Sequence, residues 1–174
     1  MKLLILTLVL LPLCAHSQVT KCKYDVNEVD SFTGLRIIET KFFKIGDTEK
    51  RDISIQAAAR KVDSTYFLFI TGLPGQCISD HDTQVSFKTV TGEIYSLKHI
   101  GEVECGKTIY VGGASAQTTP TIYLKVDKQE IRQLAMSMIR ITDGQTYTNV
   151  VLPLPIIFKQ LFDCADSAPI ARKK

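Results

Sequence analysis

The chain has 174 residues, of which 45% are apolar and 22% are charged, and it contains no Trp. These proportions are typical of a globular domain and exclude a collagen-like, coiled-coil or disordered chain. The net charge is only +3, and the longest basic run is the terminal Arg172–Lys174, so we expect no nucleic-acid partner.

The first 17 residues have the pattern of a secretory signal peptide. Lys2 precedes an unbroken apolar run from Leu3 to Cys14, and the small residues Ala15 and Ser17 follow. The run is too short for a membrane span, which needs about 20 residues. We predict cleavage after Ser17, which leaves 157 of the 174 residues with a net charge of +2. The expected location is therefore periplasmic or secreted, with no membrane span.

The mature chain is long enough for one domain, because about 157 residues bury roughly 70% of their unfolded surface. We assign residues 18–164 to a single β-rich domain and residues 165–174 to a flexible tail. A lipid anchor on Cys14 is disfavoured, because the large Leu13 precedes it where lipoprotein processing needs a small residue.

The first two thirds of the mature chain alternate short β-prone segments with turns. Turn residues occur at 30–34, Gly and Pro at 72–75, and a polar, Gly-rich stretch at 112–119 predicts a mobile loop. Residues rich in β-branched and aromatic side chains predict strands that begin at Cys22 and cover 35–45, 53–59, 65–71, 108–111 and 121–126. This pattern is typical of a β-sandwich or a curved antiparallel sheet.

Four cysteines remain after loss of the signal peptide, and an even number in an exported chain predicts two disulfides. They are Cys22, Cys77, Cys105 and Cys164, which allow three different pairings. No two of them stand at metal-ligand spacing, so a zinc site or a cysteine nucleophile is disfavoured.

A predicted hairpin selects one pairing. Apolar and polar residues alternate on both sides of a turn at Gly92, which places Phe87 opposite Tyr95. The numbers of paired residues then sum to 182, and the same sum places Cys77 opposite Cys105. Both cysteines are odd-numbered like the apolar residues of the hairpin, so a ladder without bulges would put them on the same face.

The remaining two cysteines, Cys22 and Cys164, pair by elimination and tie the two ends of the domain together. Two short helices are expected in the C-terminal third. Asp127 and Glu130 form a capping box before apolar residues at helical spacing, which predicts a helix of two to three turns. A hairpin over 138–152 follows, and after Pro155 a last helix places on one face Ile157, Leu161 and Cys164.

One motif has the spacing of a phosphate-binding loop, with Gly101, Gly106, Lys107 and Thr108 in the pattern G-x-x-x-x-G-K-T. Such a loop leads into a helix whose N-terminus faces the anion. Here a predicted strand follows Thr108. We therefore interpret the match as chance and predict no nucleotide site and no cofactor.

Two weaker groups could hold metal ions. His81, Asp82 and His99 come together in the predicted hairpin register and could bind zinc or another transition metal. The alternative is that they are turn residues and hydrogen-bonded histidines. An irregular calcium site is a further alternative at the acidic group Asp25, Asn27, Glu28 and Asp30.

Residues near both ends of the mature chain resemble a known group of proteins. The stretch from Tyr24 to Thr40, the residues Asp143 and Gly144, and the final helix that ends in Cys164 resemble small exported proteins of Bacteroidota-type bacteria. These proteins lack an assigned activity, so the resemblance implies export and a β-rich domain but no functional residue.

No acid–base pair, nucleophile or ligand set has convincing spacing. We therefore expect a non-enzymatic binding or accessory module whose partner is an extracytoplasmic protein or a saccharide. The alternative is a hydrolase or metal-dependent enzyme whose site is assembled from residues 112–119 with His81, Asp82 and His99. A pocket where a carboxylate and an imidazole converge would favour the enzyme, and a flat aromatic or polar face would favour the binder.

Overall fold

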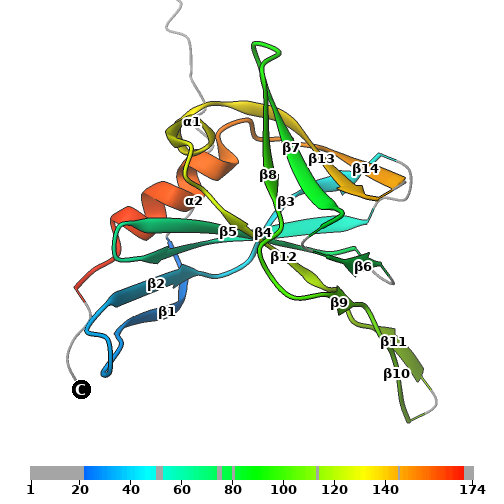
Figure 1. The fold of residues 1–174 in the computed structure, drawn as a ribbon, viewed down its shortest axis with the longest axis horizontal. Helices are drawn as coiled ribbons and strands as arrows, with labels where there is room; N and C mark the ends of the chain where they lie inside the picture. Colours follow the sequence, from blue (N-terminus) through cyan, green and yellow to red (C-terminus); the bar gives the residue numbers. More distant parts are fainter. Residues whose placement is uncertain are drawn as a thin grey trace, which may run out of the picture.

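The computed structural model describes residues 22–49, 53–73, 76–79, 81–112, 114–144 and 146–170. The predicted signal peptide and residues 171–174 lie outside these described residues. The described chain is mainly β, with antiparallel strands and two short helices, which confirms the predicted fold class (Figure 1).

The main sheet has ten strands, with β1–β2–β4–β3–β14–β13–β7–β8 along one path and β5 and β12 beyond the other edge of β4. Its strands are β1 (Tyr24–Val29), β2 (Arg36–Thr40), β3 (Phe43–Thr48), β4 (Ser54–Val62), β5 (Thr65–Thr71), β7 (Thr83–Thr89), β8 (Ile94–Lys98), β12 (Thr121–Lys125), β13 (Met136–Asp143) and β14 (Thr146–Val151). Two smaller sheets pair β6 (Cys77–Ile78) with β9 (Glu104–Cys105), and β10 (Thr108–Val111) with β11 (Ala114–Gln117).

The main sheet is strongly curved, and its two ends approach each other. Just after β8, His99 forms an isolated β-bridge with Leu124 of β12. The N–H of Ile100 also donates to the carbonyl of Tyr123 at 2.9 Å. The curved sheet is therefore joined across its open side at this junction.

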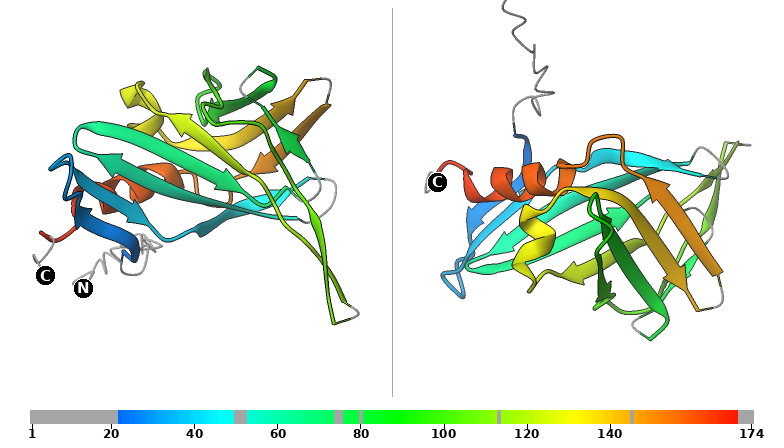
Figure 2. Two further views of the ribbon diagram at one scale, coloured as in Figure 1. Left: turned by 60° about the horizontal axis from the view of Figure 1, so that its bottom comes forward. Right: turned by 90° about the horizontal axis from the view of Figure 1, so that it is seen from above.

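Helix α2 (Ile157–Asp166) lies across the curved sheet (Figure 2) and forms with it the apolar core. The Phe158 ring packs edge-on against Phe87 with 5.4 Å between ring centroids, and Phe162 packs similarly against Tyr66 at 6.0 Å. The predicted last helix is therefore confirmed. No helix of the described residues is long and apolar enough to cross a membrane.

The other helix, α1 (Gln129–Gln133), is shorter than predicted, and its N-cap residue is Lys128 without a side-chain cap bond. The predicted two to three turns would have reached Met138, but β13 already begins at Met136. Strand β13 pairs on both sides, with β7 and β14, and buries Ile139 completely. Pairing with two neighbours outweighs the helical spacing of the apolar residues, because local propensity is a weak preference.

The predicted single strand over 35–45 is in fact two strands. Both β2 and β3 pair with the same edge of β4, and residues 41–42 separate them. At this break the buried Thr40 hydroxyl accepts a hydrogen bond from the N–H of Ala59 at 3.0 Å. A side chain thus provides a bond that a continuous backbone ladder would have made.

The predicted flexible tail over 165–174 is wrong for its first residues. Ala168 is only 8% exposed, and the Arg36 guanidinium donates to the carbonyls of Ala168 at 2.9 Å and Pro169 at 2.6 Å. Asn27 donates to the same Pro169 carbonyl. The packed domain therefore continues to Pro169.

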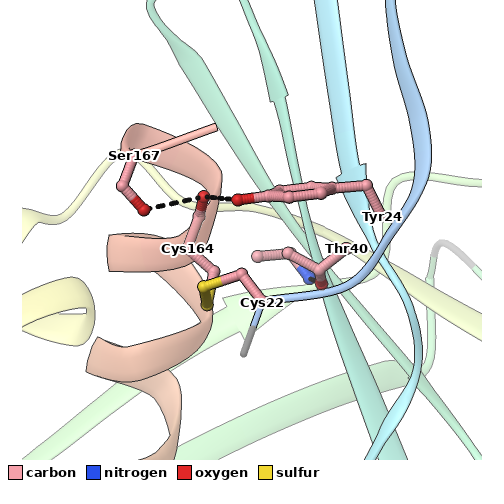
Figure 3. The surroundings of a disulfide bond; sticks show 6 residues. Cys22, Tyr24, Thr40, Cys164 and Ser167 are labelled. Carbon is pink, nitrogen blue, oxygen red and sulfur yellow. Dashed lines mark hydrogen bonds between the residues drawn. A yellow bond between two sulfur atoms is a disulfide. The ribbon is translucent and has the colours of Figure 1, made fainter. Parts of the chain in front are cut away.

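The disulfide between Cys22 and Cys164 confirms the predicted link between the ends of the domain, with 5.5 Å between the two Cα atoms. Figure 3 shows the disulfide between Cys22, which lies just before β1, and Cys164 of α2. The Tyr24 hydroxyl donates to the Cys164 carbonyl at 3.0 Å, and the Ser167 hydroxyl donates to the same oxygen. Covalent and hydrogen bonds together hold β1 against the helix.

Candidate functional site: a stapled β-arm

Residues 104–118 form a narrow arm that projects from the body of the domain, and both Figure 1 and Figure 2 show it extending away from the main sheet. It contains β9, β10 and β11. The prediction of a mobile loop over 112–119 is therefore wrong, because residues 114–117 are strand β11. Gly112, with a φ of +58°, begins the turn at the tip. The glycine pair after the β-prone residues Thr108–Val111 is a turn signal that could have suggested a hairpin here.

The base of the arm is cross-linked. Strand β9 pairs with β6, and the paired residues Cys77 and Cys105 form the second disulfide. Phe87 pairs with Tyr95 in the hairpin of β7 and β8. The predicted sum of 182 therefore holds in both ladders and confirms the pairing. The N–H of Gly106 also donates to the carbonyl of Gln76 at 2.9 Å, which extends the ladder into the arm.

The condition of a ladder without bulges is not met, and the cysteines do not share the face of the apolar residues of the hairpin. Cys77 is exposed and its neighbour Ile78 is buried, whereas Phe87 is buried in the hairpin. Residues 79–82 and 100–103 interrupt the ladder on its two strands. These interruptions are equally long, so the numbers of paired residues sum to 182 on both sides of them. The alternation of buried and exposed residues, however, shifts by one position across them.

The two strands of the arm form an isolated ribbon in which Thr108 pairs with Gln117 and Tyr110 with Ser115. The N–H of Thr118 donates to the carbonyl of Lys107 at 2.7 Å, so Lys107 and Thr118 are a hydrogen-bonded pair. Hydrogen-bonded and non-hydrogen-bonded pairs alternate in an antiparallel ladder. The N–H and C=O groups that point outward from the ribbon are therefore those of Thr108, Tyr110, Ser115 and Gln117.

The ribbon of the arm from Thr108 to Gln117 is uncharged and partly apolar. Tyr110 is 78% exposed and Ile109 is 45% exposed. No residue from Thr108 to Gln117 carries a charge. Natural sheets usually protect such free edges with charged residues, because an unprotected edge pairs with other strands. The arm therefore presents an unprotected edge on each side.

The predicted metal ligands are not assembled into a site. His99 is 2% exposed, its Nδ1 accepts a hydrogen bond from the N–H of Tyr123 at 3.0 Å, and its Nε2 lies 3.3 Å from the carbonyl oxygen of Glu102. The two ring nitrogens thus join the end of β8 to β12 and to the segment that precedes the arm. His81 and Asp82 lie in an exposed turn. Among the described side chains, no group of three or more His, Cys, Asp or Glu could hold a metal ion.

The residues of the phosphate-loop motif have structural roles. Thr108 begins a strand and no helix follows it, as expected. A Cβ atom on Gly101 would lie 2.7 Å from Cε1 of His99, so the close approach of the histidine ring requires glycine here. Gly106 belongs to the ladder at the base of the arm. The close approach of the His99 ring therefore accounts for Gly101.

The acidic group near the N-terminus is used in local contacts. Backbone hydrogen bonds from Thr33 and Phe32, and a further bond from the Thr33 hydroxyl, lower the pKa of Asp30. Asp25 forms an ion pair with Lys41 at 3.5 Å. The bonds to Asp30 order the turn between β1 and β2, and the ion pair of Asp25 lies at the other end of this hairpin. These contacts account for the two carboxylates without a calcium ion.

A polar cluster on the opposite side of the molecule anchors α2. Asp166 accepts hydrogen bonds from Lys61 at 2.7 Å and from the Tyr66 hydroxyl at 2.6 Å, and the Arg132 guanidinium lies 4.0 Å from the Tyr66 ring centroid. Burial raises the pKa of Asp166, but the bonds from Lys61 and Tyr66 outweigh it and the net pKa is lowered. The hydrogen bond to Asp166 raises the pKa of Lys61. The cluster links α2 to the hairpin of β4 and β5.

Comparisons of the chain with protein families, curated proteins and solved structures found no match.

Proposed function

We propose that this protein is an exported, non-enzymatic binding module that engages another polypeptide through its arm. The observation that carries the proposal is the uncharged two-stranded ribbon with both edges open and with Ile109 and Tyr110 exposed. The pattern of residues 1–17 and the resemblance to small exported proteins support export. The two disulfides support it further, because they persist in oxidising compartments.

A polypeptide partner fits the arm better than a saccharide does. A free strand edge offers alternating N–H and C=O groups, and another extended backbone satisfies both in register. Tyr110 adds an amphipathic ring of the kind that carries much of the binding energy at protein interfaces. The disulfide at the base fixes the position of the ribbon, which lowers the entropy lost on binding.

The alternative enzyme gains no support from the geometry. Its candidate residues were 112–119 with His81, Asp82 and His99. His99 is buried and both of its ring nitrogens have partners, while residues 114–117 form a strand of the projecting arm. Since its imidazole is already engaged, His99 is not available as a general base.

Site-specific photo-crosslinking in the native compartment tests the proposed function. A photoreactive residue replaces Ser115 on the arm or, as the matched control, Ser96, which is equally exposed on β8 of the body. We expect covalent adducts of higher mass at position 115 and none at position 96. Adding Ile109→Asp to the first variant should greatly reduce the yield. Equal yields at both positions, or no adduct at position 115, would contradict the proposal.

Export has its own test. Intact-mass measurement of protein purified from its native compartment should find a chain that begins at Gln18 and contains no free thiol. A retained leader, or reduced cysteines at Cys77 and Cys105, would contradict this part of the proposal.

A further inference from the structure

We propose that β10 of the arm pairs with β10 of a second copy of this chain, so that two arms join into one four-stranded antiparallel sheet. This inference rests on the proposed function, because it names the partner of the same arm. Three features favour a second copy as the partner. They are the charges on the strand edges, the hydrogen-bonding pattern of the ribbon and the position of Ile109.

The free edges of the body differ from those of the arm in charge. Strand β1 ends the main sheet on one side and carries Asp25 and Glu28. Strand β8 ends the path on the other side, meets β12 at the bridge between His99 and Leu124, and carries Lys98. These charges oppose edge-to-edge pairing of two bodies, because a second strand would have to bury them. Residues 108–117 contain no charge, so two copies of the arm match each other electrostatically.

The ladder within the ribbon sets the register of such a pair. Thr108 and Tyr110 point their N–H and C=O groups away from β11. A two-fold axis at Ile109 then places Thr108 of each copy opposite Tyr110 of the other, in two hydrogen-bonded pairs. The contact is self-complementary, as the interface of a symmetric dimer must be. Two arms then form one sheet of four strands. A two-stranded sheet is only marginally stable alone, so each arm gains stability from the pairing.

The choice of β10 over β11 depends on the residue at the axis. On β10 this residue is Ile109, which is 45% exposed and would lie opposite Ile109 of the other copy. Side chains approach most closely at such a non-hydrogen-bonded position. The equivalent residue on β11 is Ala116, which pairs with Ile109 inside the ribbon and offers far less apolar surface. Pairing through β10 therefore buries more apolar area.

Cysteine cross-linking tests the register directly. Ile109→Cys places two thiols across the axis at the Cα separation of about 4.5 Å that a disulfide can bridge. Oxidation of purified Ile109→Cys should produce a covalent dimer that reductant dissolves. Ala116→Cys is the matched control and should stay monomeric under denaturing conditions. Cross-linking of Ala116→Cys in place of Ile109→Cys would overturn the choice of β10.

A proline pair tests the edge without a new thiol. Tyr110→Pro removes an N–H that faces outward on β10, and Ser115→Pro removes one on β11, while neither N–H is used inside the ribbon. Sedimentation velocity at increasing protein concentration should show dimerisation of the wild type and of Ser115→Pro. Tyr110→Pro should raise the dimer dissociation constant by at least about tenfold. Retained Cys77–Cys105 disulfides would verify that the base of the arm is intact.

The possible failures are distinguishable. A wild-type protein that stays monomeric at high concentration, while position 115 still cross-links to a different protein in the native compartment, overturns the dimer and leaves the proposed function standing. A wild-type protein that stays monomeric at high concentration, together with no cross-linking at position 115 to any polypeptide, overturns both.

Discussion

The body and the arm are both antiparallel β-structure, but they differ in how each strand is covered. In the body β13 pairs on both sides, and residues such as Phe87, Phe158 and Ile139 are completely buried. In the arm β10 has one neighbour and leaves Tyr110 78% exposed. The body is stabilised by burial of apolar area. The arm buries far less apolar area and is held by a disulfide at its base.

The two disulfides serve these regions differently. Cys22–Cys164 spans 142 residues and lies beside α2, where the fold is already dense. Cys77–Cys105 spans 28 residues and is exposed at the base of the arm. We infer that the first acts mainly on global stability and the second mainly on the position of the ribbon. Substitutions in the two regions test this difference between the body and the arm.

The largest expected effect is in the core. Phe158→Ala removes a completely buried ring that packs against Phe87. We expect the free energy of unfolding to fall by about 3–5 kcal/mol, because both transfer energy and packing are lost. Urea unfolding measures this. The arm variant Tyr110→Ala should change stability by less than about 0.5 kcal/mol. Comparable losses in the two variants would contradict the contrast between body and arm.

The two disulfides should differ in how much they stabilise the protein and in how many residues they affect. The chain-entropy model gives upper values of about 5 kcal/mol for Cys22–Cys164 and about 4 kcal/mol for Cys77–Cys105. The double alanine variant of the first pair should therefore lose more global stability in urea unfolding. The variant of the second pair should show faster amide hydrogen exchange confined to residues 104–118. Fast exchange throughout the domain in the second variant would show that this staple also holds the body.

The junction of β8 and β12 should be sensitive to a single methyl group. In Gly101→Ala the added Cβ would lie 2.7 Å from Cε1 and 2.8 Å from Nε2 of His99. The ring must shift, which weakens its bond to the N–H of Tyr123, and we expect a loss of about 1–3 kcal/mol. Thermal unfolding checks this, with Ser96→Ala as the exposed control.

A rise in Tm with Mg-ATP that Lys107→Ala abolishes would instead restore the phosphate-loop interpretation.

The smallest expected effect depends on pH. The pKa of Asp166 is lower in the folded protein than its ordinary value of 3.8, so its stabilisation is present above that pH and is lost as the pH falls through the folded value. Asp166→Asn should cost less than about 1 kcal/mol at neutral pH, because its carboxylate side chain is 44% exposed. The difference from the wild type should disappear in strong acid. Urea unfolding across a pH series measures it, and a difference that persists in strong acid would contradict the role of the charged carboxylate.

The raised pKa of Lys61 predicts how the stability of the protein changes at alkaline pH. Its stabilisation is complete below the ordinary value of 10.5 and is lost as the pH rises through the higher folded value. The same series extended to alkaline pH tests both partners of the ion pair, and Lys159→Gln is the control from an exposed pair elsewhere on α2.

Local patterns in the chain predicted some elements better than others. Alternation around Gly92 predicted the pairing of Phe87 with Tyr95, and simple counting extended it to the disulfide at Cys105. The faces of the cysteines could not be predicted, because they depend on how residues 79–82 and 100–103 turn. Helical spacing after Asp127 overestimated α1, since β13 gains more by pairing with two strands.

The candidate site shows the same division. The lack of charge over 108–117 is visible in the sequence, but only the structure shows that these residues project as a ribbon without a third strand. His99 illustrates the converse, because its residue type suggested a metal ligand and its surroundings make it a link between β8 and β12.

The β-rich class, the two cysteine pairs and the amphipathic last helix could be predicted from the residues alone, because they follow from the period of apolar residues, the register of one hairpin and the number of cysteines. The folded structure was needed to see which strand edges are covered, which side chains are exposed to water and which glycines allow a neighbouring group to approach closely. Those properties depend on neighbours that are distant in the chain, and no local pattern records them.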